Sequence, residues 1–471
     1  MLSVREAAAA IDAQLLTPAG HSEDIRFTSV STDSRSIEPG VLFIALKGEH
    51  FDGHDFVQVA AAGGAVAALV DSEWAQTHRP PEGLALLAVA DVRQGLSALA
   101  TYWRKRHALP VIAVVGSNGK TTTKDMVAAI LRAHHGAAHA LATQGNFNND
   151  IGLPLSVLRL RPEHAAAVFE IGMNHPGETT TLAAIACPTI GLITNAQREH
   201  QEFLHGVDAV AREHACLIDS LPASGVLVIN ADDEHAALWR ERAGARTVCT
   251  FGLGGPAHVH VRSTLAPTAS VLEINLAGIV IRTQLAIPGV HNVRNALSAA
   301  AAAHAAGCTA EAIARGLAAF KPARGRMQVR AGEGGATLID DSYNANPDSV
   351  RAAIDVLAGS GGRTVLVLGD MGEVGDQGDQ FHREIGLYAA QQRIDVLLAT
   401  GSAARASCLA FGPAARHFED IGALGAAARS QLGGMTTVLV KGSRFMRMER
   451  VVEALAAPGA TATAANIEVG I

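Results

Sequence analysis

The segment from Val111 to Met126, VIAVVGSNGKTTTKDM, joins an apolar run to a glycine-containing turn, a lysine and three threonines. The apolar run predicts a buried strand, and the residues from Thr121 onward predict a helix. Gly116 and Gly119 allow a tight turn between them, in which backbone N–H groups face an anion at the start of the helix. A strand, an anion-binding turn and a helix in this order predict an α/β fold with a parallel sheet.

The turn resembles a phosphate-binding loop in its residue types as well as in its position. Lys120 would reach the outer phosphates of a nucleotide, and the Thr121 hydroxyl would bind Mg²⁺. The standard pattern has a further glycine where this chain has Val114, so the loop is a shortened variant, GxxGKT. The alternative, a helix start with an exposed lysine, does not explain why a strand precedes the turn and GKT opens the helix.

Strand-like and helical segments alternate along the chain of 471 residues, and they divide into three sections. We predict an α/β protein with three domains, residues 1–90, 91–321 and 322–471. The first contains the strand-like runs VLFIALKG, AVAALVD and LALLAVADV. The second contains VIAVVG, AAAVFEIG, TIGLITN and GVLVINADD, which predict a parallel sheet covered by helices on both faces. The third is a smaller alternating unit with ATLIDDS, RTVLVLGDMG, RIDVLLATG and TTVLVKGS.

Composition excludes several classes of protein. The formal net charge is −7 and aromatic residues make up 4%, which argues against a nucleic-acid-binding protein. No apolar run approaches the roughly 18–20 residues of a membrane span, so we expect no membrane insertion. The N-terminal MLSVREAAAAIDAQLL carries acidic residues and is not expected to be a signal peptide. The five cysteines are scattered without CxxC spacing, which favours reduced thiols in a cytoplasmic protein.

Two polar residues follow later strands and are candidates for binding a cation. Glu170 ends the strand in VFEIGMN, and His200 follows the strand in LITNAQREHQEF. The carboxyl ends of parallel strands are where open α/β sheets bind ligands, so the two side chains are expected near the loop. Divalent cations neutralise charge in phosphoryl transfer, which would give both residues a role. A structural salt bridge for Glu170 and a surface position for His200 remain the alternatives.

Five motifs together resemble the Mur ligases of peptidoglycan synthesis: GSNGKTTTK, EIGMN, PGVHNVRNALSAAA, GRM and DDSYNANPDS. The resemblance covers nearly the whole chain. STDSRSIEPGVLFIALKGEHFDGHDF, EIGMN and VLVKGSRFMRME are most similar to the family member that joins D-alanyl-D-alanine to UDP-N-acetylmuramoyl-tripeptide. The resemblance implies a small N-terminal substrate domain, a central P-loop ATPase domain and a C-terminal Rossmann-like domain. It also implies ATP and Mg²⁺ as cofactors, an acyl-phosphate intermediate and a monomer.

The resemblance also implies roles for individual residues around the nucleotide. Catalytic roles fall to Lys120, Glu170 and His200, and the Mg²⁺ ligands would be Thr121, Glu170 and His200. Asn295 would contact adenine, Arg326 the ATP phosphates and Asp341 the ribose, with a domain-interface salt bridge as the alternative for Arg326. The remaining implied ATP contacts are Gly116, Ser117, Asn118, Gly119, Lys120, Thr121 and Thr122.

Substrate contacts are implied in all three domains. In STDSR and KGEHFDGHDF they are Ser31, Asp33, Ser34, Arg35 and Lys47, whose alternative is a solvated loop. In the second and third domains they are Asn174, Asn344, Asn346, Lys441 and Ser443. Lys441 and Ser443 follow a buried strand and would bind a carboxylate of the substrate or of the dipeptide.

One segment departs from the family pattern. Many Mur ligases carry a lysine soon after the metal-binding histidine, and its carbamate bridges the magnesium ions. The corresponding segment here is VAREHACLI, with His214 at that position and Arg212 two residues earlier. Neither forms a stable lysine carbamate, so carbamate-dependent activation is not transferred to this chain. His214 would bind metal directly, or the second cation site would be water-bridged or weaker.

Other functions remain to be weighed against an ATP-dependent amide ligase. A P-loop NTPase switch would hydrolyse nucleotide for a protein partner, and a sister Mur ligase would add the third peptide residue. LGDMGEVG lacks the GxGxxG spacing of a dinucleotide-binding oxidoreductase. A folylpolyglutamate synthase does not account for the N-terminal section. The sequence does not distinguish diaminopimelate from lysine in the accepted tripeptide.

Overall fold

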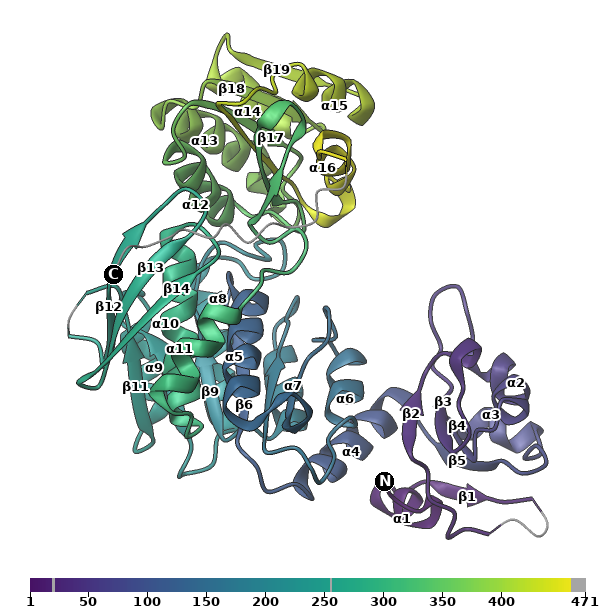
Figure 1. The fold of residues 1–471 in the computed structure, drawn as a ribbon. Coiled ribbons are helices and arrows are strands. Elements are labelled where there is room, and N and C mark those ends of the chain that lie inside the picture. Colours follow the sequence, from purple (N-terminus) through teal and green to yellow (C-terminus); the bar gives the residue numbers. More distant parts are fainter. Residues whose placement is uncertain (19–21, 255, 459–471) are drawn as a thin grey trace.

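The computed structural model describes residues 1–18, 22–254 and 256–458. They form three α/β units, each built around its own sheet (Figure 1). The first unit has a five-stranded sheet in the order β1-β5-β4-β3-β2, in which only β1 is antiparallel to its neighbour. Its strands are β1 (Gln14–Leu16), β2 (Ser29–Ser31), β3 (Val41–Ile44), β4 (Ala67–Asp71) and β5 (Ala85–Val89). Its helices are α1 (Val4–Ala10), α2 (Val57–Ala62) and α3 (Ser72–Thr77).

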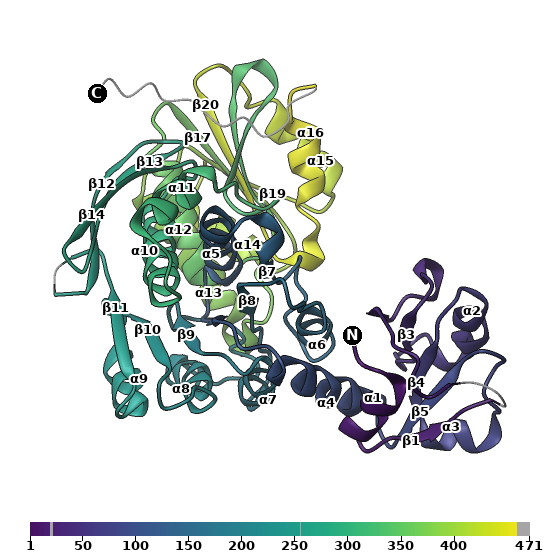
Figure 2. The same cartoon turned by 60° about the horizontal axis from the view of Figure 1, so that its bottom comes forward.

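The helix α4 (Val92–Lys105) connects the first unit to the second. Asp91 caps its start by accepting a hydrogen bond from the Gln94 backbone N–H. Its buried face includes Leu96, Leu99 and Trp103, and it packs against β4 on one side and α6 and α7 on the other. Apart from this helix and a hydrogen bond of 2.9 Å from Arg161 Nη2 to the Thr28 carbonyl oxygen, the first unit stands apart from the rest of the molecule in both views (Figures 1 and 2).

The second unit has a nine-stranded sheet in the order β14-β13-β12-β11-β10-β9-β6-β8-β7. The pairs from β7 to β12 are parallel, and β12, β13 and β14 form an antiparallel ribbon at one edge. The strands are β6 (Val111–Val115), β7 (Ala140–Ala142), β8 (Ala166–Glu170), β9 (Ile190–Ile193), β10 (Val226–Asn230), β11 (Thr247–Phe251), β12 (Val259–Leu265), β13 (Ser270–Leu276) and β14 (Ile279–Leu285). The helices are α5 (Lys120–His135), α6 (Gly152–Val157), α7 (Glu178–Ala186), α8 (Val207–Asp219), α9 (Ala236–Ala243), α10 (Val290–Ala305) and α11 (Ala310–Ala319).

Alternate side chains of the central strand β6 point to opposite faces of this sheet. Ile112 and Val114 pack in the cluster that includes residues of α5, α10 and α11, whereas Val111, Ala113 and Val115 pack in the cluster that includes residues of α4, α6, α7 and α8. Both faces are therefore covered by helices, as the sequence predicts for a parallel sheet. The alanine-rich α10 packs closely against α5, because its small side chains let two helices approach.

The antiparallel ribbon is the part of the second unit that the sequence analysis did not predict. β13 alternates between buried and more exposed residues, which is the pattern of a strand with one face in the core. A two-residue turn joins β13 to β14, and both of its residues, Ala277 and Gly278, have positive φ. The alternation in β13 and the two-residue turn after it are the sequence features that could have predicted this ribbon.

The third unit has a six-stranded sheet in the order β15-β16-β20-β17-β18-β19, in which only the edge strand β15 is antiparallel. Its strands are β15 (Gln328–Ala331), β16 (Thr337–Asp341), β17 (Arg363–Leu368), β18 (Val396–Thr400), β19 (Ala415–Phe418) and β20 (Thr436–Lys441). Its helices are α12 (Pro347–Ala358), α13 (Gly378–Gln391), α14 (Ala404–Phe411), α15 (Ile421–Arg429) and α16 (Glu449–Leu455).

The predicted three-domain α/β fold is confirmed. Each of the three sheets lies within one of the predicted sections, although the boundaries at residues 90 and 321 stay predictions. Among the described residues, no helix combines the length and the apolar character that crossing a membrane requires.

Candidate active site

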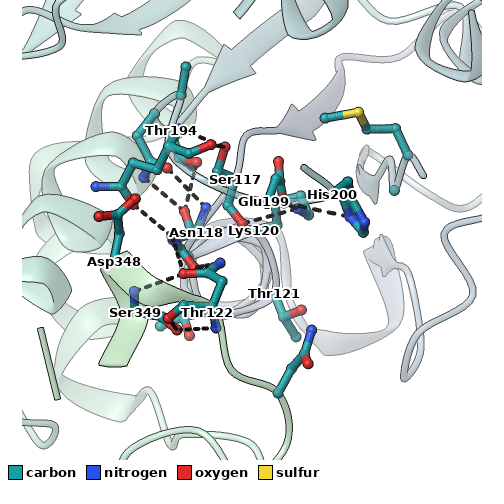
Figure 3. Close-up of a pocket in the computed structure, with 18 of the residues that line it drawn as sticks. Ser117, Asn118, Lys120, Thr121, Thr122, Thr194, Glu199, His200, Asp348 and Ser349 are labelled. Carbon is teal, nitrogen blue, oxygen red and sulfur yellow. Dashed lines mark hydrogen bonds and ion pairs between the residues drawn. The ribbon is translucent and has the colours of Figure 1, made fainter. Parts of the chain in front are cut away.

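A cavity of about 1330 Å³ lies between the second and third units. From the second unit it is lined by the segments that follow β6, β8, β9 and β10. From the third unit it is lined by the segments after β16 and β17 and by the last residue of β20. The carboxyl ends of parallel strands from two sheets therefore face one cavity, which is the expected ligand position in open α/β sheets. Figure 3 shows the labelled side chains that come together there.

The predicted phosphate loop forms a tight turn between β6 and α5. Gly116 has φ +132° and Gly119 has φ +83°, conformations that glycine adopts without strain. Neither glycine has room for a side chain, because a Cβ at Gly116 would overlap Thr194 Oγ1 and one at Gly119 would overlap Asn295 Oδ1. The backbone N–H of Asn118 donates to Asn195 Oδ1 over 2.9 Å, which fixes the loop against the segment after β9.

The Lys120 ammonium lies over this loop, where a phosphate-binding lysine is expected. Its Nζ donates to the carbonyl oxygens of Gly116 over 2.5 Å and Ser117 over 3.3 Å. It also forms an ion pair of 3.2 Å with Glu199 Oε2, a residue that the sequence analysis did not select. The loop carbonyls and Glu199 thus hold the Lys120 ammonium in one position (Figure 3).

Glu199 is a buried carboxylate with its side chain 6% exposed. His214 Nε2 lies 3.1 Å from its Oε1, so the carboxylate is held from a second side. Burial alone would raise the pKa of Glu199, but the Lys120 ammonium and the imidazoles of His214 and His200 outweigh it and hold the pKa at about 2. Glu199 directly precedes His200 in the segment after β9. The sequence therefore offered it as a second candidate ligand, although only His200 was predicted.

Glu170 and Thr121 meet at the first turn of α5. Glu170 Oε1 accepts hydrogen bonds from the Thr121 hydroxyl over 3.1 Å and from Asn148 Nδ2 over 2.8 Å. The other carboxylate oxygen, Oε2, is buried and has no hydrogen-bond partner in the described part of the chain. A buried carboxylate oxygen without a partner is costly unless a cation or donor satisfies it. The two oxygen donors fit a hard divalent cation such as Mg²⁺.

His200 lies between carboxylates of two units. Its Nδ1 is 2.8 Å from Glu373 Oε2 of the third unit, and its Nε2 is 3.8 Å from Glu199 Oε2. The close contact with the His200 ring lowers the pKa of the Glu373 carboxyl. His200 is therefore at the cavity and not at an isolated surface position, and its role as a cation ligand stays a prediction.

The third unit brings further polar groups to the loop. Arg326 Nη2 donates to Thr121 Oγ1 over 3.3 Å, and its guanidinium lies 4.1 Å from the centre of the Tyr343 ring. The side-chain amides of Asn118 and Asn346 exchange hydrogen bonds of 2.9 and 3.3 Å across the cavity. Arg326 therefore contacts the first turn of the helix that follows the phosphate loop. Its contact with the ATP phosphates stays a prediction.

A cluster of cross-unit ion pairs surrounds Arg198, in the segment after β9. Its guanidinium pairs with Asp348 over 2.5 Å, at the start of α12, and with Glu384 of α13 over 2.8 Å. These two carboxylates raise the pKa of Arg198, against the opposing effect of burial. The segment 198–200 thus links the phosphate loop to the third unit.

Asp341 and Lys441 end neighbouring parallel strands of the third unit and form a buried ion pair of 2.6 Å. Asp341 Oδ1 also accepts from the Met327 backbone N–H over 3.1 Å, and Lys441 Nζ donates to the Asn344 carbonyl over 2.9 Å. Both ion-paired residues line the cavity. Lys441 is thus already neutralised by Asp341, a partner that the sequence analysis did not foresee.

The remaining predicted residues differ in how close they lie to the cavity. Thr122, Asn174, Asn295 and Asn344 line it, and Asn295 also donates to Asn292 Oδ1 over 3.1 Å. Ser443 does not line it: its hydroxyl donates to the Ala345 carbonyl over 3.2 Å and accepts from the Gly372 N–H over 2.6 Å.

The predicted contacts in the first unit lie outside the cavity: Ser31, Asp33, Ser34, Arg35 and Lys47. Asp33 and Arg35 form an ion pair of 2.7 Å, and the hydrogen bond from the Arg35 side chain lowers the pKa of Asp33 to about 2. Arg35 is exposed, so this pair faces solvent. Any contact that these residues make with a substrate is therefore with a part distant from the phosphate loop.

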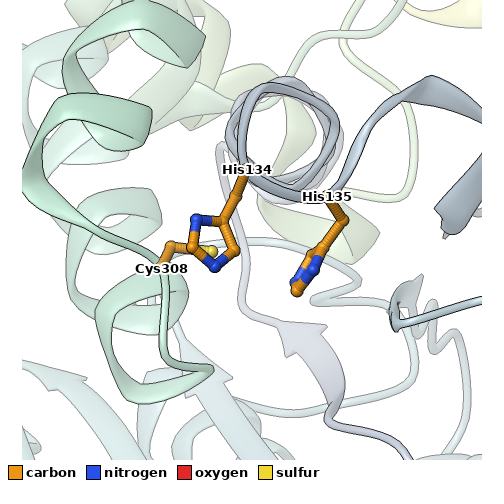
Figure 4. Close-up of side chains that lie close together, drawn as sticks. All are labelled: His134, His135 and Cys308. Atoms are coloured by element: carbon orange, nitrogen blue, oxygen red, sulfur yellow. The ribbon is translucent and has the colours of Figure 1, made fainter.

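A separate cluster lies at the other end of α5, where His134 and His135 meet Cys308 (Figure 4). Their potential ligand atoms all lie within 4.8 Å of one another. Burial raises the pKa of the Cys308 thiol to about 11 and lowers the pKa of His135, which favours the neutral form of both groups. None of the three residues lines the cavity.

Comparisons with known proteins agree across the whole chain. Three family models match: "Mur ligase family, catalytic domain" at residues 26–104, "Mur ligase middle domain" at 114–303, and "Mur ligase, glutamate ligase domain" at 325–444. The chain is 38% identical to the UDP-N-acetylmuramoyl-tripeptide--D-alanyl-D-alanine ligase of Escherichia coli K12, over 92% of this chain and 94% of that protein. It is 34% identical to the enzyme of that name from Haemophilus influenzae, over 92% and 94% of the two chains.

A solved structure of MurF from Acinetobacter baumannii has the same fold. It superposes with a TM-score of 0.86 at 34% identity and covers 96% of this chain and 98% of that one. The phosphate loop, the cavity between two units and these relatives lead to one conclusion. The chain belongs to the Mur ligase family.

Proposed function

We propose that this chain is an ATP-dependent ligase that joins D-alanyl-D-alanine to UDP-N-acetylmuramoyl-tripeptide in peptidoglycan precursor synthesis. The observation that carries the proposal is the cavity with a phosphate loop on one side and cationic and polar groups of the third unit on the other. Relatives that carry this activity in their names match more than nine tenths of the chain. A P-loop switch with a protein partner does not account for such a match.

The reaction explains why the cavity combines these groups. A peptide carboxylate is a poor electrophile, so its oxygen first attacks the γ-phosphorus of ATP, which gives an acyl phosphate and releases ADP. The amine of D-alanyl-D-alanine then attacks the acyl carbon, which forms the amide and releases phosphate and a proton. No protein nucleophile is needed in either step. The protein contributes by orienting the reactants and by offsetting negative charge.

The charge problem is most acute in the first step, because two anions must approach each other. Lys120 and the backbone N–H groups of the loop would bind the phosphates at the positive end of α5. Arg326, which contacts Thr121 from the third unit, would add a second positive charge. Asn295 and Asp341 line the same cavity and would contact the rest of the nucleotide.

The residues at the loop also fit a magnesium ion. Thr121 and Glu170 would hold it, since the two side chains are in contact and Glu170 Oε2 has no other partner in the described chain. A bound Mg²⁺ supplies charge neutralisation on the phosphate oxygens during phosphoryl transfer. His200 would serve a second cation.

An activity assay tests the proposed function directly. ADP release should require a UDP-N-acetylmuramoyl-tripeptide and D-alanyl-D-alanine together, and should stay at background when either is omitted. Substrates ending in diaminopimelate or in lysine, and the dipeptide precursor, should be crossed with D-alanyl-D-alanine and with single amino acids. Rapid ATP hydrolysis without a peptide would contradict the proposal, and turnover of the dipeptide precursor with a single amino acid would indicate the sister ligase.

The magnesium site gives a prediction for Glu170→Gln. The amide keeps an oxygen for Thr121 but removes the negative charge, so the Mg²⁺ concentration for half-maximal activity should rise about tenfold or more. A magnesium titration of ADP release measures it. Asp150→Asn, at the exposed rim of the cavity and paired with Arg93, is a control that should leave the Mg²⁺ requirement unchanged. An unchanged requirement in Glu170→Gln would exclude metal ligation by this residue.

We also infer that the first unit binds the UDP-sugar part of the substrate, and that the protein acts as a monomer in the cytoplasm. Ser31, Asp33, Ser34, Arg35 and Lys47 lie outside the cavity, as contacts to a distant part of a long substrate would. All groups assigned to the reaction come from one chain. Arg35→Ala should raise KM for the nucleotide-peptide while KM for ATP stays the same. Light scattering after size-exclusion chromatography should give one chain per particle.

A further inference from the structure

Glu199 is a buried carboxylate at the phosphate loop to which the reaction above assigns no role. Its Oε2 pairs with Lys120 Nζ over 3.2 Å and its Oε1 lies 3.1 Å from His214 Nε2, with the side chain 6% exposed. Buried ion pairs contribute little net stability, because desolvating both charges offsets their attraction. Stability of the fold therefore does not explain why a carboxylate stands here.

His214 holds this carboxylate in one orientation. It lies on α8 with its side chain 1% exposed, and its Nε2 faces only Glu199 and, at 3.5 Å, the Ser117 hydroxyl. Nδ1 is buried and has no hydrogen-bond partner in the described part of the chain. Because Nε2 must donate to the carboxylate, a neutral ring carries its proton there. His214 thus positions Glu199 and does not itself reach the cavity, whose lining lacks it.

Glu199 also lies beside a candidate ligand of the second cation, because its Oε2 is 3.8 Å from His200 Nε2, and the same end of the loop carries a carboxylate oxygen without a partner among the described residues. Glu170 Oε2 is buried, lacks a partner in the described chain, and belongs to a residue only 2% exposed. Glu199 contacts Lys120 and Glu170 contacts Thr121, so the two carboxylates flank consecutive residues at the start of α5. Cations at phosphate groups prefer oxygen ligands, and two carboxylates at the phosphate loop supply them.

Building on the proposed function, we propose that Glu199, oriented by His214, is the permanent carboxylate ligand of a second divalent cation at the phosphate loop. It replaces the lysine carbamate that the family resemblance implies at residue 214. A carbamate forms when a neutral lysine amine adds to CO₂ and loses a proton, so it depends on dissolved CO₂. Glu199 carries its carboxylate in the chain itself, and the enzyme therefore needs no CO₂.

Binding of Mn²⁺ in the presence of ADP tests this without any turnover. Electron paramagnetic resonance should count two bound Mn²⁺ ions per wild-type chain. Glu199→Gln should weaken one of them about tenfold or more, and Glu199→Asp should restore part of the affinity. His214→Gln should weaken the same ion while the melting temperature stays near that of the wild type. Glu202→Gln, an exposed carboxylate of the same loop with no ion pair in the described chain, is the matched control and should bind both ions.

Carbon dioxide provides the second measurement. Wild-type ligation should be the same in CO₂-depleted buffer and with added bicarbonate, and bicarbonate should not rescue Glu199→Gln. Two Mn²⁺ ions bound with wild-type affinity by Glu199→Gln, or activation of the wild type by bicarbonate, would overturn the proposal. If Glu199→Gln does not fold, Glu199→Asp and His214→Gln carry the Mn²⁺ measurement. That measurement uses ADP alone, so a failure of the ligase assay would leave its result standing.

Discussion

At the scale of single residues, the phosphate loop depends on a chain of contacts that runs from Lys120 through Glu199 to His214. Each group is buried or nearly so, and each has a partner in the next. A buried charge is tolerated when it is paired and becomes costly when the partner is removed. A substitution of Lys120 should therefore affect both phosphate binding and the stability of the second unit.

Lys120→Ala should abolish ADP formation, because no other group in the loop replaces the ammonium at the phosphates. It should also lower the free energy of unfolding of the second unit by about 3 kcal/mol, since Glu199 loses its main partner in a buried site. Chemical denaturation followed by circular dichroism measures the second effect. The double variant Lys120→Ala/Glu199→Gln should recover part of the loss without recovering activity. Substantial turnover by Lys120→Ala would refute the phosphate role.

The low pKa of Glu199 predicts how stability depends on pH. The folded-state pKa is about 2, below the ordinary value of 4.5, so its ionised form stabilises the fold above pH 4.5. That contribution is lost as pH falls from 4.5 toward 2, because protons then bind the unfolded chain first. Glu199→Gln has no such titration, so the melting temperature of the wild type should fall relative to that of the variant between pH 5 and pH 3. A difference that stays constant over this range would exclude a depressed pKa at Glu199.

At the scale of elements, the unit β6–loop–α5 works because its glycines let other segments touch the backbone. Gly119 meets Asn295 of α10, and Gly116 meets Thr194 after β9. The loop is therefore set by helix α10 and strand β9 as much as by its own sequence. Val114, which stands where the standard loop has glycine, is a buried residue of β6 paired with Glu170 of β8.

A comparison of Gly119→Ala with Gly307→Ala distinguishes the loss of the Gly119–Asn295 contact from backbone strain. The new Cβ would overlap Asn295 Oδ1, and the residue would be forced into a positive-φ conformation at a cost of about 1–2 kcal/mol. We expect KM for ATP to rise about tenfold or more, together with a lower melting temperature. Gly307→Ala has a similar φ of +89° with open space around it, so it should show the strain alone, with ATP binding unchanged. Equal effects of the two substitutions would contradict the role of the Asn295 contact.

At the scale of the whole molecule, the cavity exists only because the third unit packs against the second. Arg198 pairs with Asp348 and Glu384, and His200 pairs with Glu373, so the second unit supplies the basic side chains and the third unit the carboxylates. The groups proposed to bind the ATP phosphates are divided between the units in the same way, with Lys120 on one and Arg326 on the other. A site divided between two units in this way is complete only while the units are in contact.

Arg198→Ala should therefore loosen the association of the second and third units. The ion pairs are about a quarter exposed and worth about 1 kcal/mol between them after solvent screening. We expect a larger radius of gyration in small-angle X-ray scattering and a higher KM for D-alanyl-D-alanine. Arg240→Ala, on α9 and without an ion pair in the described residues, is the control. A radius of gyration equal to that of the wild type would show that other contacts suffice for closure.

The sequence by itself determined the local pieces of this protein: the strand, turn and helix of the phosphate loop, the alternation that predicts parallel sheets, and the family motifs. These depend on residues close together in the chain, where backbone preferences and periodicity act directly. The tertiary structure decided which side chains meet. Glu199 and His214 come from a loop and a helix, and Asn118 and Asn346 from two units 228 residues apart. Such pairings follow from how the sheets and helices pack. The role of a charged residue can be inferred only once its burial and its partner are known.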